Sequence, residues 1–206
     1  MLWDGQVNDT SVLLKMPNWC FNTLCVAGPA EDIAIYISKT TKKDGMPQLL
    51  FSDEVPVPEG ESGWDAWGTK WEPDGAEWDY AEGSMVCDVQ FETPWGPPIA
   101  WMRKVSARYP SLLFELDYDE CGQEIRGIML MKAGELIREY DAEPYFCSVY
   151  DDEDPDDEGP EEDETEEAWN DRQKAKKEAR ERFCEVEKLG YQMRREMEMR
   201  AAVAVA

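Results

Sequence analysis

The chain has 206 residues, of which 42% are hydrophobic, and it carries a formal net charge of −25 at pH 7. This charge disfavours direct binding of DNA or RNA, because neutralising phosphates requires a basic surface. The sequence contains no histidine, which removes the side chain that most often serves as a general base and as a metal ligand.

The first quarter of the chain contains strand and helix patterns. Residues 1–15 have weak periodicity and are interpreted as an N-terminal extension. Residues 18–26 alternate in polarity, which predicts a strand. Residues 30–43 begin with acidic residues and end with lysines, as the helix dipole favours, so we expect a helix. Residues 49–57 are predicted to form a short second strand.

The middle of the chain begins with an insertion and ends with a hairpin. Residues 58–83 are rich in tryptophan, glycine, proline and carboxylates. Residues 84–94 alternate like a half-buried strand, and residues 99–109 have apolar side chains at helical spacing. Residues 112–120 and 124–136 read as the two strands of a hairpin around a Cys-Gly turn.

The resulting order of elements, β-α-β-β-α-β-β, is that of a ferredoxin-like fold with an extra strand. We therefore predict an α+β domain over residues 16–148, with an antiparallel sheet and two helices on one face. The tryptophan-rich insertion is expected to cover the open face of this sheet or one of its ends.

The C-terminal quarter changes in character. Residues 151–171 contain 14 acidic and no basic residues, so residues 149–167 are predicted to be a disordered acidic linker. Residues 168–202 are predicted to form a long helix within a C-terminal segment, 168–206, and Gly190 should weaken this helix locally. The helix packs on the body or forms a coiled-coil dimer, and both remain open. Its apolar stripe consists of Phe183, Val186, Leu189, Met193 and Met197.

The six cysteines are scattered without a CxxC pair. No signal peptide or membrane span is recognisable, which favours a reducing cytoplasm with free thiols. No cofactor and no metal site is expected, and a nucleophilic cysteine would lack a histidine partner.

Four short motifs occur in a fixed order: PNWCFNTLCVAG (17–28), WGTKWEP (67–73), FETPWGPP (91–98) and YPSLLFELDYDECGQEIRG (109–127). Together they resemble the YubB-like ferredoxin-fold family carried by phages and conjugative plasmids. The chain departs from the family pattern at Cys121, which lies between the acidic residue and the glycine of the hairpin. The resemblance implies a fold and a mobile-element origin, but no reaction.

Two groups of residues are candidates for binding. The first is aromatic and could either anchor the insertion as a small core or form a platform for a ligand, with a lysine stacked on an indole. Its candidates are Trp67, Lys70, Trp71, Trp95, Tyr118 and Glu120. The second is the acidic tract, which is either a solubilising linker or a nucleic-acid mimic. Its candidates are Asp151, Asp152, Glu153, Asp154, Asp156, Asp157, Glu158, Glu161, Glu162, Asp163 and Glu164.

From these observations we predict a non-enzymatic accessory protein that acts in the cytoplasm of a host cell. It would bind and inhibit a basic, nucleic-acid-handling host protein, with carboxylates in place of phosphates. The alternative is a module that binds a small ligand or nucleotide through Trp67, Trp71 and Trp95. A hydrolase or transferase is disfavoured, because histidine and a phosphate-binding loop are missing.

Overall fold

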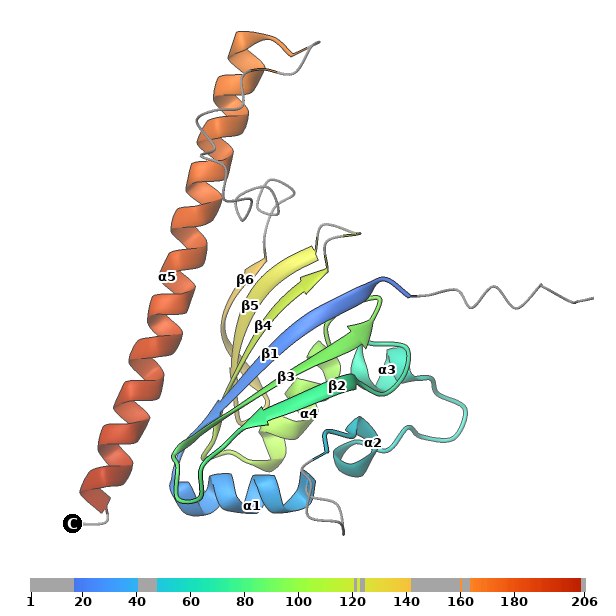
Figure 1. Ribbon diagram of the computed structural model, residues 1–206, viewed down its shortest axis with the longest axis vertical. Coiled ribbons are helices and arrows are strands. Elements are labelled where there is room, and N and C mark those ends of the chain that lie inside the picture. Colours follow the sequence, from blue (N-terminus) through green and yellow to red (C-terminus); the bar gives the residue numbers. More distant parts are fainter. Residues whose placement is uncertain are drawn as a thin grey trace, which may run out of the picture.

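The computed structural model describes residues 17–40, 48–120, 122, 125–141, 160 and 164–204. Their centre is a six-stranded antiparallel sheet with the strand order β2-β3-β1-β4-β5-β6 (Figure 1). The order of the first four strands is that of a ferredoxin-like fold, which confirms the predicted α+β class. The strands are β1 (Trp19–Ala27), β2 (Asp74–Asp79), β3 (Val86–Pro94), β4 (Leu113–Glu120), β5 (Ile125–Lys132) and β6 (Glu135–Asp141).

Four helices lie on one face of this sheet and a fifth lies on the other (Figure 1). The four are α1 (Ala30–Thr40), α2 (Phe51–Glu54), α3 (Gly63–Trp67) and α4 (Ile99–Arg108), and the fifth is α5 (Glu166–Ala204). Helix α1 begins at the predicted residue and has acidic residues in its first turn and Lys39 in its last, while residues 41–43 of the predicted range lie outside the described residues. Ile33, Tyr36 and Ile37 of α1 are buried against the sheet.

The main core lies between the sheet and these four helices. Alternate residues of β1 and β3, among them Leu24 and Val89, point into it and are fully buried. Phe51 of α2 is at its centre, with its ring centroid 4.6 Å from that of Trp101 and 6.0 Å from that of Phe91. Such aromatic contacts combine a large buried apolar area with favourable ring geometry.

Two strand predictions were wrong. The short strand predicted over residues 49–57 contains helix α2 instead, and the carboxylate of Glu72 accepts hydrogen bonds from the backbone amides of Phe51 and Ser52 at its first turn. The second strand is β2, inside the predicted insertion. The strand predicted over 124–136 is interrupted at Ala133 and Gly134, whose φ angles of 53° and 82° form a tight hairpin turn between β5 and β6.

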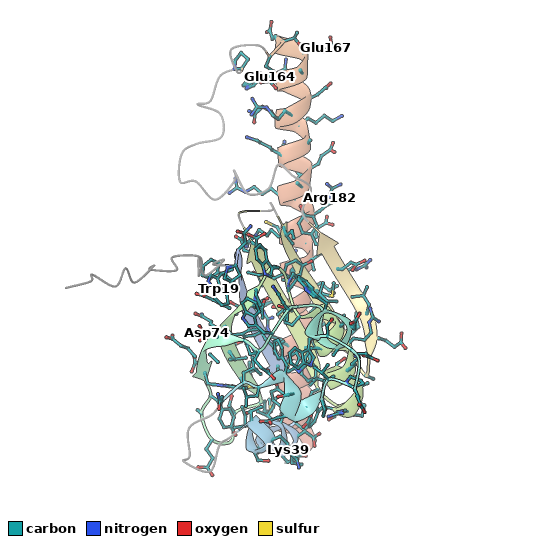
Figure 2. All side chains as sticks on the ribbon, turned by 90° about the vertical axis from the view of Figure 1, so that its right-hand side faces the viewer. Trp19, Lys39, Asp74, Glu164, Glu167 and Arg182 are labelled. Carbon is teal, nitrogen blue, oxygen red and sulfur yellow. The ribbon has the colours of Figure 1, made fainter. Side chains whose placement is uncertain are left out.

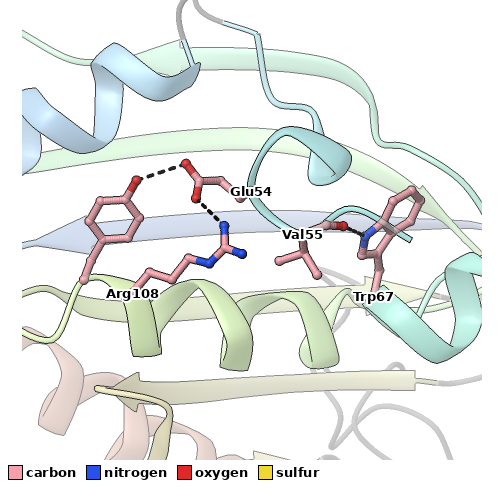
Figure 3. A network of polar contacts seen from close by, with 5 residues as sticks. Glu54, Val55, Trp67 and Arg108 are labelled. Carbon is pink, nitrogen blue, oxygen red and sulfur yellow. Dashed lines mark hydrogen bonds and ion pairs between the residues drawn. The ribbon is translucent and has the colours of Figure 1, made fainter. Parts of the chain in front are cut away.

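The tryptophan-rich insertion does not cover the open face of the sheet, which was one of its two predicted locations, because Ala66 and Trp67 pack on the helix-covered side. The second predicted location, one end of the sheet, agrees with the hydrogen bond from the Thr69 hydroxyl to the Pro94 carbonyl at the end of β3. The Trp67 side chain is 5% exposed, and its Nε1–H donates a hydrogen bond of 2.7 Å to the Val55 carbonyl (Figure 3). Beside it, the buried Glu54 carboxylate accepts hydrogen bonds from Tyr109 and Arg108. The insertion thus fills the core that α1 and α4 leave open.

The predicted C-terminal helix is present as α5. Its C-terminal part runs along the sheet, while its first turns, near Glu167, extend beyond the sheet (Figure 2). Val186 is buried and Leu189 and Met193 are half-buried in a second apolar cluster, whereas the side chains of Phe183 and Met197 lie outside the described residues. None of the described helices combines the length and the apolar composition that a membrane crossing requires.

Candidate functional site

The sheet face opposite α1–α4 carries an array of carboxylates, which follows from the strand register. Phe21, Thr23 and Cys25 of β1 point to this face, because their neighbours Asn22 and Leu24 point into the core. Directly paired residues of adjacent strands lie on the same face, so each of these three has two cross-strand neighbours. They are Glu92 and Asp119 beside Phe21, Gln90 and Asp117 beside Thr23, and Asp88 and Glu115 beside Cys25.

The array continues onto the edge strand β2, where Glu77 pairs with Gln90 and Asp79 with Asp88. We use the name acidic face for the surface formed by Glu77, Asp79, Asp88, Glu92, Glu115, Asp117 and Asp119. Like charges in directly opposed positions, such as Asp79 and Asp88, destabilise a sheet. Their presence here points to a role for the charge other than stabilising the fold.

A hollow of about 490 Å³ lies on the acidic face. Its lining includes Phe21, Glu77, Glu92, Asp117 and Asp119. The Phe21 side chain is 54% exposed although it is in the middle of the sheet. An aromatic ring surrounded by carboxylates offers both a cation–π surface and charge partners, which suits an arginine or lysine side chain.

Two arginines of the chain already bind on this face. Arg126 of β5 is 9% exposed, and its guanidinium lies 2.8 Å from Asp119 and 3.7 Å from Asp117. Arg194 of α5 forms an ion pair with the buried carboxylate of Glu115. Ion pairs between a guanidinium and a carboxylate are among the stronger polar contacts. In both arginine contacts here, the carboxylates belong to outward-facing residues of β4.

The residues of the recognised motifs meet at the end of the sheet where β1 begins. Asn22 donates 2.8 Å hydrogen bonds to the Cys20 carbonyl and the Thr93 hydroxyl, and Thr93 donates to Gly96. Thr69 of the second motif donates a 2.7 Å bond to the Pro94 carbonyl. These bonds join β1, β3 and the segment after α3, so the motif residues stabilise that end of the fold.

The aromatic candidates are not brought together. Trp67 belongs to the core, whereas Trp71 is 39% exposed. The Lys70 ammonium lies 5.2 Å from the centroid of the Trp71 ring, so the indole on which this lysine stacks is that of Trp71. Trp95 is half-buried at the end of β3, with a φ angle of 71°.

The remaining two candidates of the first group, Tyr118 and Glu120, are 2% and 1% exposed on the core side of β4. The Tyr118 hydroxyl lies above Gly127, where a Cβ atom would come within 2.3 Å of it. One Glu120 oxygen accepts a 2.9 Å hydrogen bond from the Gly122 amide. Among the described residues, three hollows on the carboxylate-bearing side of the sheet and beside α5 are lined by none of the six candidates. Their role in ligand binding stays a prediction.

The candidate acids from Asp151 to Asp163 lie outside the described residues. Glu164 is described, and its carboxylate forms a 2.6 Å ion pair with Arg172 of α5. The carboxylates of the acidic face were absent from the sequence-based candidates. The sequence showed the polar positions of residues 84–94, but it did not show which strands would pair with this segment.

The buried thiols are poorly suited to act as nucleophiles. Burial raises the pKa of Cys20 and of Cys87 to about 12, so both thiols stay protonated at neutral pH. Within the described ranges, no three acidic or cysteine side chains converge in a way that could hold a metal ion. Binding through charge is therefore the chemistry that the described surface offers most clearly.

Comparison with known proteins connects this fold to one family. A family model described as the ferredoxin-like domain in Api92-like protein matches residues 66–183. The crystal structure of the protein api92 from Yersinia pseudotuberculosis is similar over 62% of this chain and 98% of that chain, with a TM-score of 0.51 and 10% sequence identity. At this identity the likeness concerns the fold alone. No curated protein matches the chain.

Proposed function

We propose that this chain, which belongs to the family defined by the ferredoxin-like domain of Api92-like proteins, binds a basic protein through its acidic face. The observation that carries the proposal is the array of outward carboxylates around the exposed Phe21. Because this array already holds Arg126 and Arg194, we expect it to bind arginine-rich segments of another protein.

The partner in this proposal is a nucleic-acid-handling protein of the host cell. Such proteins present basic surfaces that bind phosphates, and a surface of ordered carboxylates can occupy them in place of nucleic acid. Inhibition would then be competitive with DNA or RNA. The proposal includes a phage or conjugative-plasmid origin and a counter-defence role in the host cytoplasm, which the resemblance to YubB-like proteins suggests.

Charge complementarity favours fast association, because opposite potentials steer the encounter of two proteins. Binding should weaken as the salt concentration rises, since the Debye length is about 8 Å at physiological ionic strength. The exposed Phe21 adds a contact that salt does not screen.

The test compares two full-length variants that lose the same charge. One carries Glu77→Gln, Asp79→Asn and Glu92→Gln on the acidic face, and the other carries Asp53→Asn, Glu59→Gln and Glu61→Gln around α2 and α3. Affinity for a fluorescent nona-arginine peptide is measured by anisotropy. We expect the first variant to bind about tenfold more weakly, since three charge contacts of about 0.2–1 kcal/mol each are lost. The second should stay within about twofold of the wild type.

Equal losses in both variants would show that only the total charge matters and would contradict a defined binding face. If both variants bind like the wild type, while replacing the acids of residues 151–163 by serine and glutamine abolishes binding, the acidic tract is the binding element instead. Proteins that bind the wild-type chain from a host lysate should be released by added DNA, and their retention in excess DNA would contradict the nucleic-acid mimic.

A further inference from the structure

Helix α5 occupies one part of the sheet face that carries the carboxylates. Ala179 and Val186 are buried, and Leu189 and Met193 half-buried, against an apolar strip of the sheet. This strip consists of Leu113 of β4, Ile128 and Leu130 of β5, and Tyr140 of β6. Next to it, Arg194 reaches the carboxylate of Glu115. The chain thus binds an arginine-bearing amphipathic helix of its own.

The position of this helix depends on Gly190. A Cβ atom at this residue would lie 1.8 Å from a carboxylate oxygen of Glu115, so any larger residue would push the helix from the sheet or displace Glu115. Glycine is unfavourable inside a helix, and Gly190 is in the interior of α5. Its presence is explained by the close approach to β4 and not by the stability of the helix.

Helix α5 has 39 residues, and most of its described side chains are exposed or half-buried. Among its described side chains, only Lys176, Ala179, Val186 and the glycine are buried. Its first turns, near Glu167, project beyond the sheet (Figure 2). Elements with few buried apolar contacts open at a lower free-energy cost than the core of a domain. The described side chains of α5 therefore offer few apolar contacts that hold the helix on the sheet.

We propose that the apolar strip and Glu115 form a groove for a helix, and that a basic amphipathic helix of the partner replaces α5 in it. The inference rests on the proposed function and adds the form of the partner's binding element. Residues 172–206 contain 10 basic and 6 acidic residues, and the other acidic residues of α5, Glu166, Glu167 and Asp171, precede them. The part of α5 after Asp171 therefore has the basic charge expected of such an occupant. The partner's helix would place apolar residues on the strip and an arginine at Glu115, and its other basic residues would face Asp88 and Asp117.

The experiment measures how readily the groove exchanges its occupant. A labelled synthetic peptide with the sequence of residues 166–204 is added to four full-length chains: wild type, Gly190→Ala, Arg194→Gln and Arg195→Gln. Arg194→Gln removes the ion pair between the chain's own helix and Glu115 and changes no residue of the groove. Gly190→Ala introduces a clash between the helix and the Glu115 carboxylate. Arg195→Gln is the matched control, because it removes the same charge from an arginine whose guanidinium lies 5.9 Å from the exposed Tyr191 ring.

We expect the peptide to bind Gly190→Ala and Arg194→Gln at least tenfold more tightly than the wild type, and Arg195→Gln within twofold of it. Unchanged melting of the sheet core would confirm that the variants are folded. Equal affinity for all four chains would overturn the inference. So would a wild-type dimer that Arg194→Gln dissociates, because a second copy's α5 would then be the occupant.

The outcomes distinguish a failure of the helix groove from a failure of the proposed function. If the peptide results are negative but nona-arginine binding still depends on Glu77, Asp79 and Glu92, the helix groove is wrong and the acidic face stands. In the opposite case, the peptide exchanges as expected, but nona-arginine binding does not depend on those carboxylates. The groove then binds helices, while the wider acidic face has no part in binding. Both the proposed function and its extension to a partner helix would be wrong.

Discussion

The two faces of the sheet are built by the same strands and differ in what their side chains do. On one face, buried residues such as Leu24, Val89 and Leu116 pack against α1–α4 in a continuous core. On the other, most of the residues of β3 and β4 that pair with the outward-facing residues of β1 are carboxylates, and a single helix covers only part of the surface. The first face can supply enough burial for the fold, so the second is free to carry charge that costs stability.

The largest expected effect concerns the helix-covered face. Trp67→Ala should lower the free energy of unfolding by about 3–5 kcal/mol, because it removes a large side chain that is 5% exposed. Trp71→Ala, at 39% exposure, should cost less than about 1 kcal/mol. Urea denaturation of both variants measures the difference. Comparable losses of unfolding free energy in the two variants would contradict the placement of Trp67 in the core and of Trp71 at the surface.

A second prediction concerns pH and the same face. The Cys87 thiol has an ordinary pKa of 9.0 and a folded pKa of about 12, raised by burial and then by Asp88. Above pH 9 the unfolded chain loses this proton while the folded chain keeps it, so stability falls as pH rises towards 12. Urea denaturation under reducing conditions at pH 7, 9 and 10.5 should show this fall.

Cys87→Ala should be less stable at pH 7 but should show a shallower fall above pH 9. Cys184→Ser, which changes an exposed thiol of α5, should keep the wild-type slope. A slope that is the same in all three chains would exclude the buried thiol as a cause of alkaline destabilisation.

The smallest effect has the opposite sign and belongs to the acidic face. Asp79→Asn removes the repulsion between Asp79 and the directly opposed Asp88, so it should stabilise the fold by about 0.2–1 kcal/mol. The gain should shrink in high salt because these charges are near the solvent. Glu59→Gln, outside any strand, is the control with no expected change. A loss of stability in Asp79→Asn would contradict the view that this face carries charge at the expense of the fold.

The same difference between the faces explains what the sequence could predict. Strands β1, β3 and β4 were recognisable because their buried side chains recur at every second residue, as in Leu112, Phe114, Leu116 and Tyr118. Strand β2 was missed, since this edge strand has only Ala76 and Trp78 packed against the core. The spacing of apolar residues alone could not distinguish the short helix α2 from a strand.

The acidic face was beyond prediction for a different reason. Its carboxylates were visible one by one, but their grouping depends on register between distant segments, such as Thr23 with Gln90 and Asp117. A shift of one residue would have sent them to the other face. The role of Gly190 likewise appears only when Glu115 is seen beside it. The residue types that stood out in the sequence were instead the tryptophans and the carboxylates of the acidic tract.

The most direct test of the central claim is to map where a basic ligand binds on the intact chain. Amide ¹H–¹⁵N spectra of the full-length protein would be recorded during titration with nona-arginine peptide at low salt. We predict that the shifted amides concentrate in residues 21–25, 77–79, 88–92 and 115–119, which contain the outward-facing residues of β1, β2, β3 and β4. Shifts confined to residues 149–163, or to the Trp67–Trp71 segment, would contradict the claim that the acidic face is the binding surface.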